Sequence, residues 1–149
     1  MTIHTIFYSW QTDSENSTNR GFIEQALNQA VKAIRSDNFI HVEPVVDRDT
    51  LGLSGSPDIA TTIFSKIDKA DIFLCDVSII NTASGSRPTP NPNVLVELGY
   101  ALKALGSSQI IMIFNMASGK PEELPFDLRG KRLISYHVTS AVLLCPQTR

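Results

Sequence analysis

Glu97 is the side chain in this sequence whose type and position best suit catalysis. It lies in NPNVLVELGYALKALG, residues 91–106, where Asn91 and Asn93 around the rigid Pro92 predict the capped start of a helix. Four residues along a helix give a rise of about 6 Å, so Asn93 and Glu97 share a face and Tyr100 lies within reach of both. A carboxylate at such a point could stabilise positive charge that develops in a transition state.

The same residues also have structural interpretations. Asn93 is favoured mainly as a helix cap, and Glu97 suits a solvated position as well as a catalytic one. Gly99 lacks a side chain in mid-helix, at a cost of about 1 kcal/mol relative to alanine. This glycine indicates that a strand, a loop or a ligand comes close, unless it serves only as a packing device.

The elements that must position these residues follow from hydrophobic patterns. Apolar runs of strand length alternate with helical spacing, which is typical of βαβ units. Helices are predicted over 22–34, 57–70 and 93–106, and strands over 3–10, 41–47, 71–80, 109–115 and 132–138. Right-handed crossovers then predict an α/β, flavodoxin-like three-layer fold with a five-stranded parallel sheet of order 2-1-3-4-5. Ligands in such sheets bind beyond the carboxyl ends of the strands at the switch point, here strands 1 and 3.

The first strand ends in three residues suited to a ligand. Tyr8 and Trp10 fall on one face of the strand, where a ring could stack on a base, and core packing is the alternative for both. Ser9 between them could donate a hydrogen bond to a phosphate or a ribose.

The second and third predicted strands also carry charged residues, at or near their ends. Asp47, Arg48 and Asp49 end the second strand, either as a structural ion-pair cluster or as partners for the polar groups of a nucleotide. Asp76, in the third strand, is expected to cap the loop that follows or to contact the same ligand.

Composition narrows the classes of function. A chain of 149 residues with 42% hydrophobic content suits one domain, and a net charge of −2 argues against a nucleic-acid partner. The segment GLSGSP lacks the lysine of a P-loop, no GxGxxG follows a strand, and the three histidines have no metal-ligand spacing. Two cysteines, no export signal and no apolar run long enough to span a bilayer predict a cytoplasmic protein without membrane contact.

Four stretches of the sequence together carry a resemblance to a known family. They are IFYSWQTDSENSTNRGFIEQAL, DRDTLGLSGSPDIATTIFSKIDKADIFLCDVS, PNPNVLVELGYALKALG and ELPFDLRGKRLISY. The chain, to about residue 138, resembles bacterial TIR-like (Toll/interleukin-1 receptor-like) nucleotide-binding domains that cleave NAD. The resemblance implies that Glu97 is the essential glutamate and that residues 48–57 are the mobile BB loop. Many members carry an aromatic residue where this chain has Asn93.

The resemblance also implies a function and partners. It suggests an NAD glycohydrolase in bacterial anti-phage defence signalling, with NAD as substrate and no cofactor. Leu51 and Leu53 in the BB-like loop would dock on a neighbouring protomer, giving a homo-oligomer, and a sensor domain would lie outside this chain. Residues 139–149 are expected to be an irregular tail, as a truncation would leave.

Two other functions stay open on the sequence. A nucleoside 2-deoxyribosyltransferase-like enzyme also has a flavodoxin-type fold and a glutamate in an ExGxA context, which ELGYA matches. A non-catalytic module that binds a nucleotide or another TIR domain would make Glu97 dispensable and Leu51 and Leu53 important.

Overall fold

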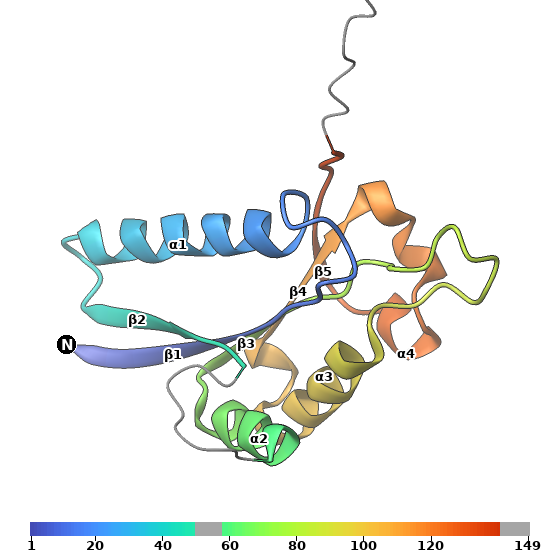
Figure 1. Cartoon of the computed structure of the whole chain (residues 1–149). Coiled ribbons are helices and arrows are strands. Elements are labelled where there is room, and N and C mark those ends of the chain that lie inside the picture. Colours follow the sequence, from blue (N-terminus) through green and yellow to red (C-terminus); the bar gives the residue numbers. More distant parts are fainter. Residues whose placement is uncertain (50–57, 141–149) are drawn as a thin grey trace, which may run out of the picture.

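All five strands of the sheet are parallel and lie in the predicted order. The computed structural model describes residues 1–49 and 58–140. The strands run in the order β2-β1-β3-β4-β5 (Figure 1). The elements are β1 (Thr2–Ser9), α1 (Arg20–Ser36), β2 (Val42–Asp47), α2 (Ile59–Lys69), β3 (Ile72–Asp76), α3 (Pro92–Leu105), β4 (Ile110–Asn115), α4 (Phe126–Arg129) and β5 (Leu133–Tyr136). The α/β flavodoxin-like fold is therefore confirmed, with β1 and β3 at the switch point.

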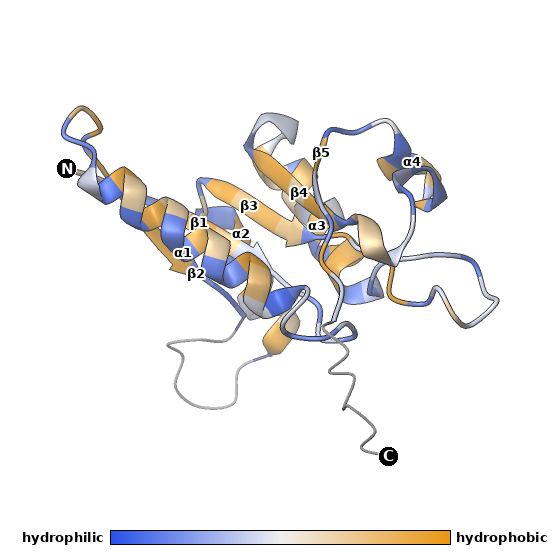
Figure 2. Ribbon diagram, turned by 90° about the horizontal axis from the view of Figure 1, so that it is seen from above, coloured by the Kyte–Doolittle hydropathy of each residue, from blue (hydrophilic) through white to orange (hydrophobic). Residues whose placement is uncertain are grey.

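Helices cover the sheet on both faces, and strand alternation divides the core between them. Helix α1 lies on one face, while α2 and α3 lie on the other (Figure 1). Ile23, Leu27 and Val31 recur at helical spacing along α1 and pack with Tyr8 and Leu74 of the sheet. The neighbouring strand residues point the opposite way and join α2 and α3 in a second cluster. Figure 2 shows the hydrophobic strands between helices that are hydrophobic on one side only. No helix among the described residues combines the length and the apolar character that a membrane span requires.

The third strand is shorter than its apolar run predicts. The expected strand extends to residue 80, but β3 ends at Asp76, whose Oδ1 accepts the Ser78 backbone N–H at 2.9 Å. This local bond turns the chain away from the sheet. Val77 and Ile79 remain buried after the strand has ended, which explains why the hydrophobic pattern runs on.

The start of α3 also differs from the prediction. The helix begins at Pro92, and the N-cap is Asn91, whose side chain accepts the Asn93 N–H at 2.8 Å. The prediction that Asn93 caps the helix is wrong, because a proline at the first helical position places the cap one residue before it. Gly99 is exposed, and no described strand or loop comes within 4 Å of the place of a Cβ there, so the expected approach by a strand or a loop is not found among the described residues.

Candidate active site around Glu97

Glu97 and Ser9 meet where α3 passes the carboxyl end of β1. The Ser9 hydroxyl donates to Glu97 Oε2 across 2.5 Å. Ser9 is buried as the last residue of its strand, and Glu97 lies in the second turn of the helix that follows β3. The two elements at the switch point therefore fix one carboxylate between them.

The surroundings of Glu97 make its carboxylate harder to ionise than that of an exposed glutamate. Burial raises the pKa of Glu97, the hydrogen bond from Ser9 lowers it, and the negative charge of Asp49 raises it again, with a net upward shift. Asp49 follows β2 with a positive φ of 30°, a backbone conformation that aspartate tolerates better than most residues. Acids from two different segments thus face one another at this point of the sheet.

Two adjoining cavities share Glu97 and Ile63 in their walls. The smaller, of about 40 Å³, is lined by the end of β1 together with Asp49. The larger, of about 410 Å³, lies between α2 and α3, and Asn93 is part of its wall. Its other lining residues are Asp58, Ile59, Ala60, Phe64 and Val96, most of them apolar. An apolar hollow with one carboxylate in its wall suits a ring-bearing ligand.

Trp10 is the centre of an aromatic and basic cluster beside the smaller cavity. Its ring and that of Tyr8 form a T-shaped pair, with the ring centroids 5.8 Å apart. The guanidinium carbons of Arg20 and Arg48 lie over the Trp10 ring at 3.9 and 4.9 Å from its centroid. Arg48 Nη1 also forms an ion pair with Glu24. The sequence analysis proposed that Trp10 stacks on a base, whereas in this structure the ring contacts two cations.

Tyr8 belongs to the core. Its ring is only 1% exposed and packs under α1, and its hydroxyl donates to the Arg20 backbone carbonyl at 3.2 Å. Burial raises the pKa of this phenol well above its usual range. The side chain still forms part of the wall of the smaller cavity.

The structure separates the three charged residues that follow β2. Asp47 accepts a hydrogen bond from Lys66 Nζ of α2 at 2.8 Å. Arg48 turns to the opposite face and pairs with Glu24 of α1, while Asp49 faces Glu97. The cluster is therefore structural at Asp47, and its other two members lie at the site.

Asp76 and Tyr100 line neither of the two cavities. Asp76 is fully buried and accepts a hydrogen bond from Asn19 Nδ2 at 3.0 Å as well as the Ser78 backbone N–H, so it holds the loop after β3 as expected. Burial raises the pKa of Asp76.

The Tyr100 hydroxyl donates to Asp68 of α2 at 2.8 Å, and its ring stacks on Phe64. The sequence analysis placed Tyr100 within reach of Asn93 and Glu97, whereas the contacts of its side chain are with Asp68 and Phe64 of α2.

A network of buried polar side chains lies beneath the site, and the sequence analysis missed most of it. Asn115 ends β4 and donates to the Val138 carbonyl at 2.9 Å and to Asn19 Oδ1 at 3.3 Å. Gln11 donates to the Ser78 carbonyl at 2.7 Å and accepts the Asn91 N–H at 2.9 Å. No buried side-chain nitrogen or oxygen among the described residues lacks a partner. A polar residue at the end of an apolar strand, such as Asn115, was the sequence signal that could have predicted this network.

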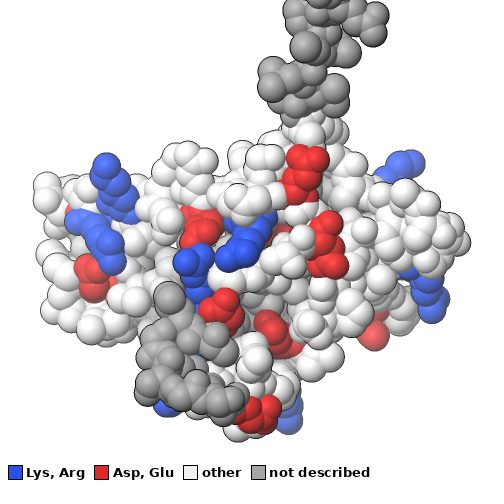
Figure 3. Space-filling view, in the orientation of Figure 1, with Lys and Arg blue, Asp and Glu red and all other residues white. Residues whose placement is uncertain are grey.

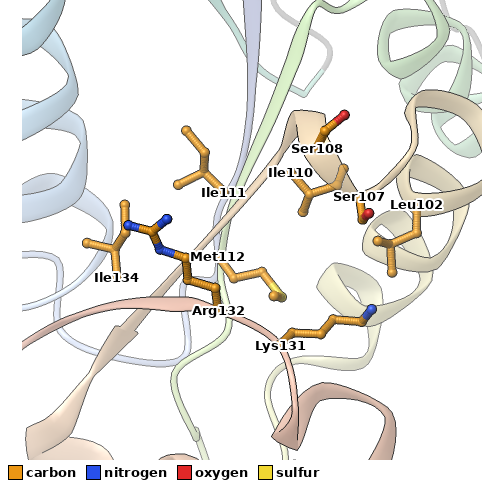
Figure 4. Close-up of a pocket in the computed structure, with 9 residues that line it drawn as sticks. All are labelled: Leu102, Ser107, Ser108, Ile110, Ile111, Met112, Lys131, Arg132 and Ile134. Atoms are coloured by element: carbon orange, nitrogen blue, oxygen red, sulfur yellow. The ribbon is translucent and has the colours of Figure 1, made fainter.

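A separate hollow of about 480 Å³ lies where β4 and β5 begin, and Glu97 is not among its lining residues. Figure 4 shows the basic groups of Lys131 and Arg132 pointing away from one another across its floor, so they do not converge on one anion. Parallel sheets bind ligands at the carboxyl ends of their strands, and this hollow lies at the amino ends. The cavities at Glu97 are the better candidate.

Charges of both signs are interspersed over the molecule. Figure 3 shows acidic and basic side chains mixed over the centre of the face in view, rather than gathered into a field of one sign. Within residues 1–49 and 58–140, no group of three or more His, Cys, Asp or Glu side chains could hold a metal ion.

Fold and site together define an α/β flavodoxin-like domain with a serine-held glutamate at its switch point. Comparison of the chain with protein-family models and with curated proteins finds no match. Leu51 and Leu53, which the sequence analysis assigned to assembly, lie outside the described residues.

Proposed function

We propose that this chain is a TIR-like NAD glycohydrolase that cleaves the bond between nicotinamide and ribose, with Glu97 as its essential carboxylate. The observation that carries the proposal is the position of this carboxylate. Ser9 fixes it at the carboxyl ends of β1 and β3, and it lines a small cavity and the largely apolar one of about 410 Å³. The resemblance of four sequence stretches to TIR-like domains supports the same assignment.

The chemistry needs one anion and no acid. As the C1′–N bond breaks, its electrons return to the pyridinium ring, which leaves as neutral nicotinamide, and positive charge develops on the ribosyl group. Glu97, as a carboxylate, stabilises that charge or holds the ribose hydroxyls. Water then adds at C1′ and loses a proton, so the products are nicotinamide, ADP-ribose and H⁺. Because the leaving group is already cationic, no second carboxyl group has to protonate it.

Replacement of Glu97 by glutamine tests the proposal. We expect Glu97→Gln to lower the rate of nicotinamide release from NAD by roughly a hundredfold or more, because the amide keeps the shape and loses the charge. Glu122→Gln is the matched control, since Glu122 is exposed and lines neither cavity. Nicotinamide and ADP-ribose are measured by chromatography at equal protein concentrations.

The stability of the variant separates catalysis from folding. Because the pKa of Glu97 is raised in the folded chain, its ionised form destabilises the fold at neutral pH relative to a neutral side chain. The Ser9 hydroxyl can still donate to the amide oxygen of glutamine. Glu97→Gln should therefore unfold at a temperature no lower than the parent does, and a stable variant with parental activity would refute a role for this carboxylate.

The resemblance also supports a proposal about assembly. We place the chain in the cytoplasm as the effector of an anti-phage signalling protein whose sensor domain lies elsewhere. Leu51 and Leu53 of the loop 48–57 would dock on a second copy of the chain and complete its site. Of the first two residues of that loop, Arg48 lies over the Trp10 ring and Asp49 lines the smaller cavity together with Glu97.

A further inference from the structure

Two guanidinium groups from distant parts of the chain gather on one indole ring. Arg20 is the first residue of α1 and Arg48 follows β2, yet their guanidinium carbons lie 3.9 and 4.9 Å from the Trp10 ring centroid. Because both distances are measured to the same ring centroid, their sum is an upper limit on the distance between the two guanidinium carbons. The two cations repel one another, and the Trp10 ring, a carboxylate or a bound anion would each offset that repulsion.

The protein supplies one carboxylate for the two cations. Glu24 pairs with Arg48, and about a third of each side chain is exposed, 32% and 28%. The guanidinium group of Arg20 makes no hydrogen bond or ion pair with any residue that the structure describes; its contact there is with the Trp10 ring. A guanidinium over an aromatic face keeps its N–H donors available, and these match the geometry of phosphate oxygens.

This basic cluster adjoins the acidic part of the site. Trp10 follows Ser9 directly and lines the smaller cavity together with Asp49 and Glu97. The site thus has a negative pole at Glu97 and Asp49 and a positive pole at Arg20 and Arg48. NAD has the complementary pattern, since its pyridinium ring is cationic and its diphosphate is anionic. A neutral nucleoside has neither charge and would leave the arginines unused.

We propose that Arg20 and Arg48 bind the diphosphate of a dinucleotide whose reacting ribose lies at Glu97. The inference rests on the proposed function and adds the group that the ligand must carry. Glu24 occupies part of the position that a phosphate oxygen would take on Arg48. Binding of a diphosphate therefore competes with Glu24, and removal of this carboxylate should strengthen binding.

The fluorescence of Trp10 gives a direct test, because the chain contains one tryptophan. The protein is titrated with ADP, which has the diphosphate and no bond to cleave, and with adenosine, which has no phosphate. We expect ADP to change the Trp10 emission saturably and to bind at least tenfold more tightly than adenosine. Arg20→Gln and Arg48→Gln should each weaken ADP binding about tenfold or more, and Glu24→Gln should strengthen it.

Matched controls keep the outcomes distinct. Arg35→Gln removes an arginine from the same helix, one that pairs with Glu43, and should leave ADP binding unchanged. Arg20→Lys keeps the charge without the planar fork and should bind ADP with intermediate affinity. Should Arg20→Gln fail to fold, the lysine variant and the loss of ADP affinity with added salt carry the test.

The proposal is overturned if ADP does not bind, if it binds no better than adenosine, or if the arginine variants bind it as the parent does. Its failure is separable from that of the glycohydrolase assignment. ADP binding that depends on both arginines, in a protein that does not cleave NAD, would refute the enzyme and retain this subsite. Cleavage of NAD with an unchanged KM in Arg20→Gln would retain the glycohydrolase assignment and refute this subsite.

Discussion

Replacement of Asn91 by alanine should destabilise the protein, while the same change two residues later should not. The Asn91 side chain accepts the Asn93 N–H at 2.8 Å and so satisfies one of the free donors at the start of α3. Its Nδ2 also donates to Asp13 at 2.7 Å in an exposed position. The backbone N–H of residue 91 donates to Gln11, and alanine retains that bond.

The magnitude follows from these contacts. Loss of an asparagine cap costs about 1 kcal/mol, and an exposed polar contact such as that with Asp13 adds a few tenths at most. For a domain of this length, about 1 kcal/mol lowers Tm by roughly 2–4 °C. The Asn93 side chain is exposed and makes no hydrogen bond to any described residue, so Asn93→Ala should change stability by less than about 0.5 kcal/mol.

Urea denaturation of the parent and both variants, followed by far-ultraviolet circular dichroism, measures the difference. The midpoint should fall for Asn91→Ala alone, with the same slope for all three proteins, because the surface exposed on unfolding does not change. An equal loss in both variants, or no loss in Asn91→Ala, would refute the assignment of the cap.

Two further predictions concern activity. Because the pKa of Glu97 is raised in the ligand-free protein and the proposed mechanism uses its ionised form, kcat/KM should rise with pH through that elevated pKa. Ser9→Ala removes the bond that lowers this pKa and should move the acid limb to higher pH, whereas Asp49→Asn removes a charge that raises it and should move the limb lower. Shifts of the two variants in the same direction, in kcat/KM measured from acidic to neutral pH, would contradict this electrostatic account. If assembly completes the site, specific activity should rise with protein concentration and Leu53→Asp should suppress the rise without unfolding the chain. Activity that is flat on dilution and equal in the variant would show that one protomer suffices.

The strands were predictable because each is an apolar run, a local property of the sequence, and their order was predictable because right-handed crossovers leave few arrangements of a doubly wound sheet. The end of β3 was not, because burial continues after Asp76 while the strand ends in a side-chain hydrogen bond. Hydrophobicity reports burial, and burial alone does not distinguish a strand from a buried loop. The cap of α3 was available in principle, since the preference for proline at the first helical position points to Asn91.

The site was predictable in its location and less so in its partners. Ser9 and Glu97 both follow from the switch point of the sheet, and the structure brings them within 2.5 Å. Arg48 pairs with Glu24, and Asp47 pairs with Lys66. These partners depend on which helix faces lie beside β2 once the chain has folded. Arg20 was missed for the same reason, since nothing near it in the sequence signals Trp10 as its neighbour.

The buried polar network beneath the site has a consequence for how the sequence can evolve. Asn19, Asp76 and Asn115 satisfy one another or the adjoining backbone, so a single replacement leaves a buried donor or acceptor without its partner, at a cost of about 1–3 kcal/mol. Substitution of two partners together can be nearly neutral. These positions should therefore covary among relatives of the chain, while the exposed residues of α3 drift independently. Such covariation would identify relatives that keep this buried network beneath the site even where the catalytic residues themselves had changed.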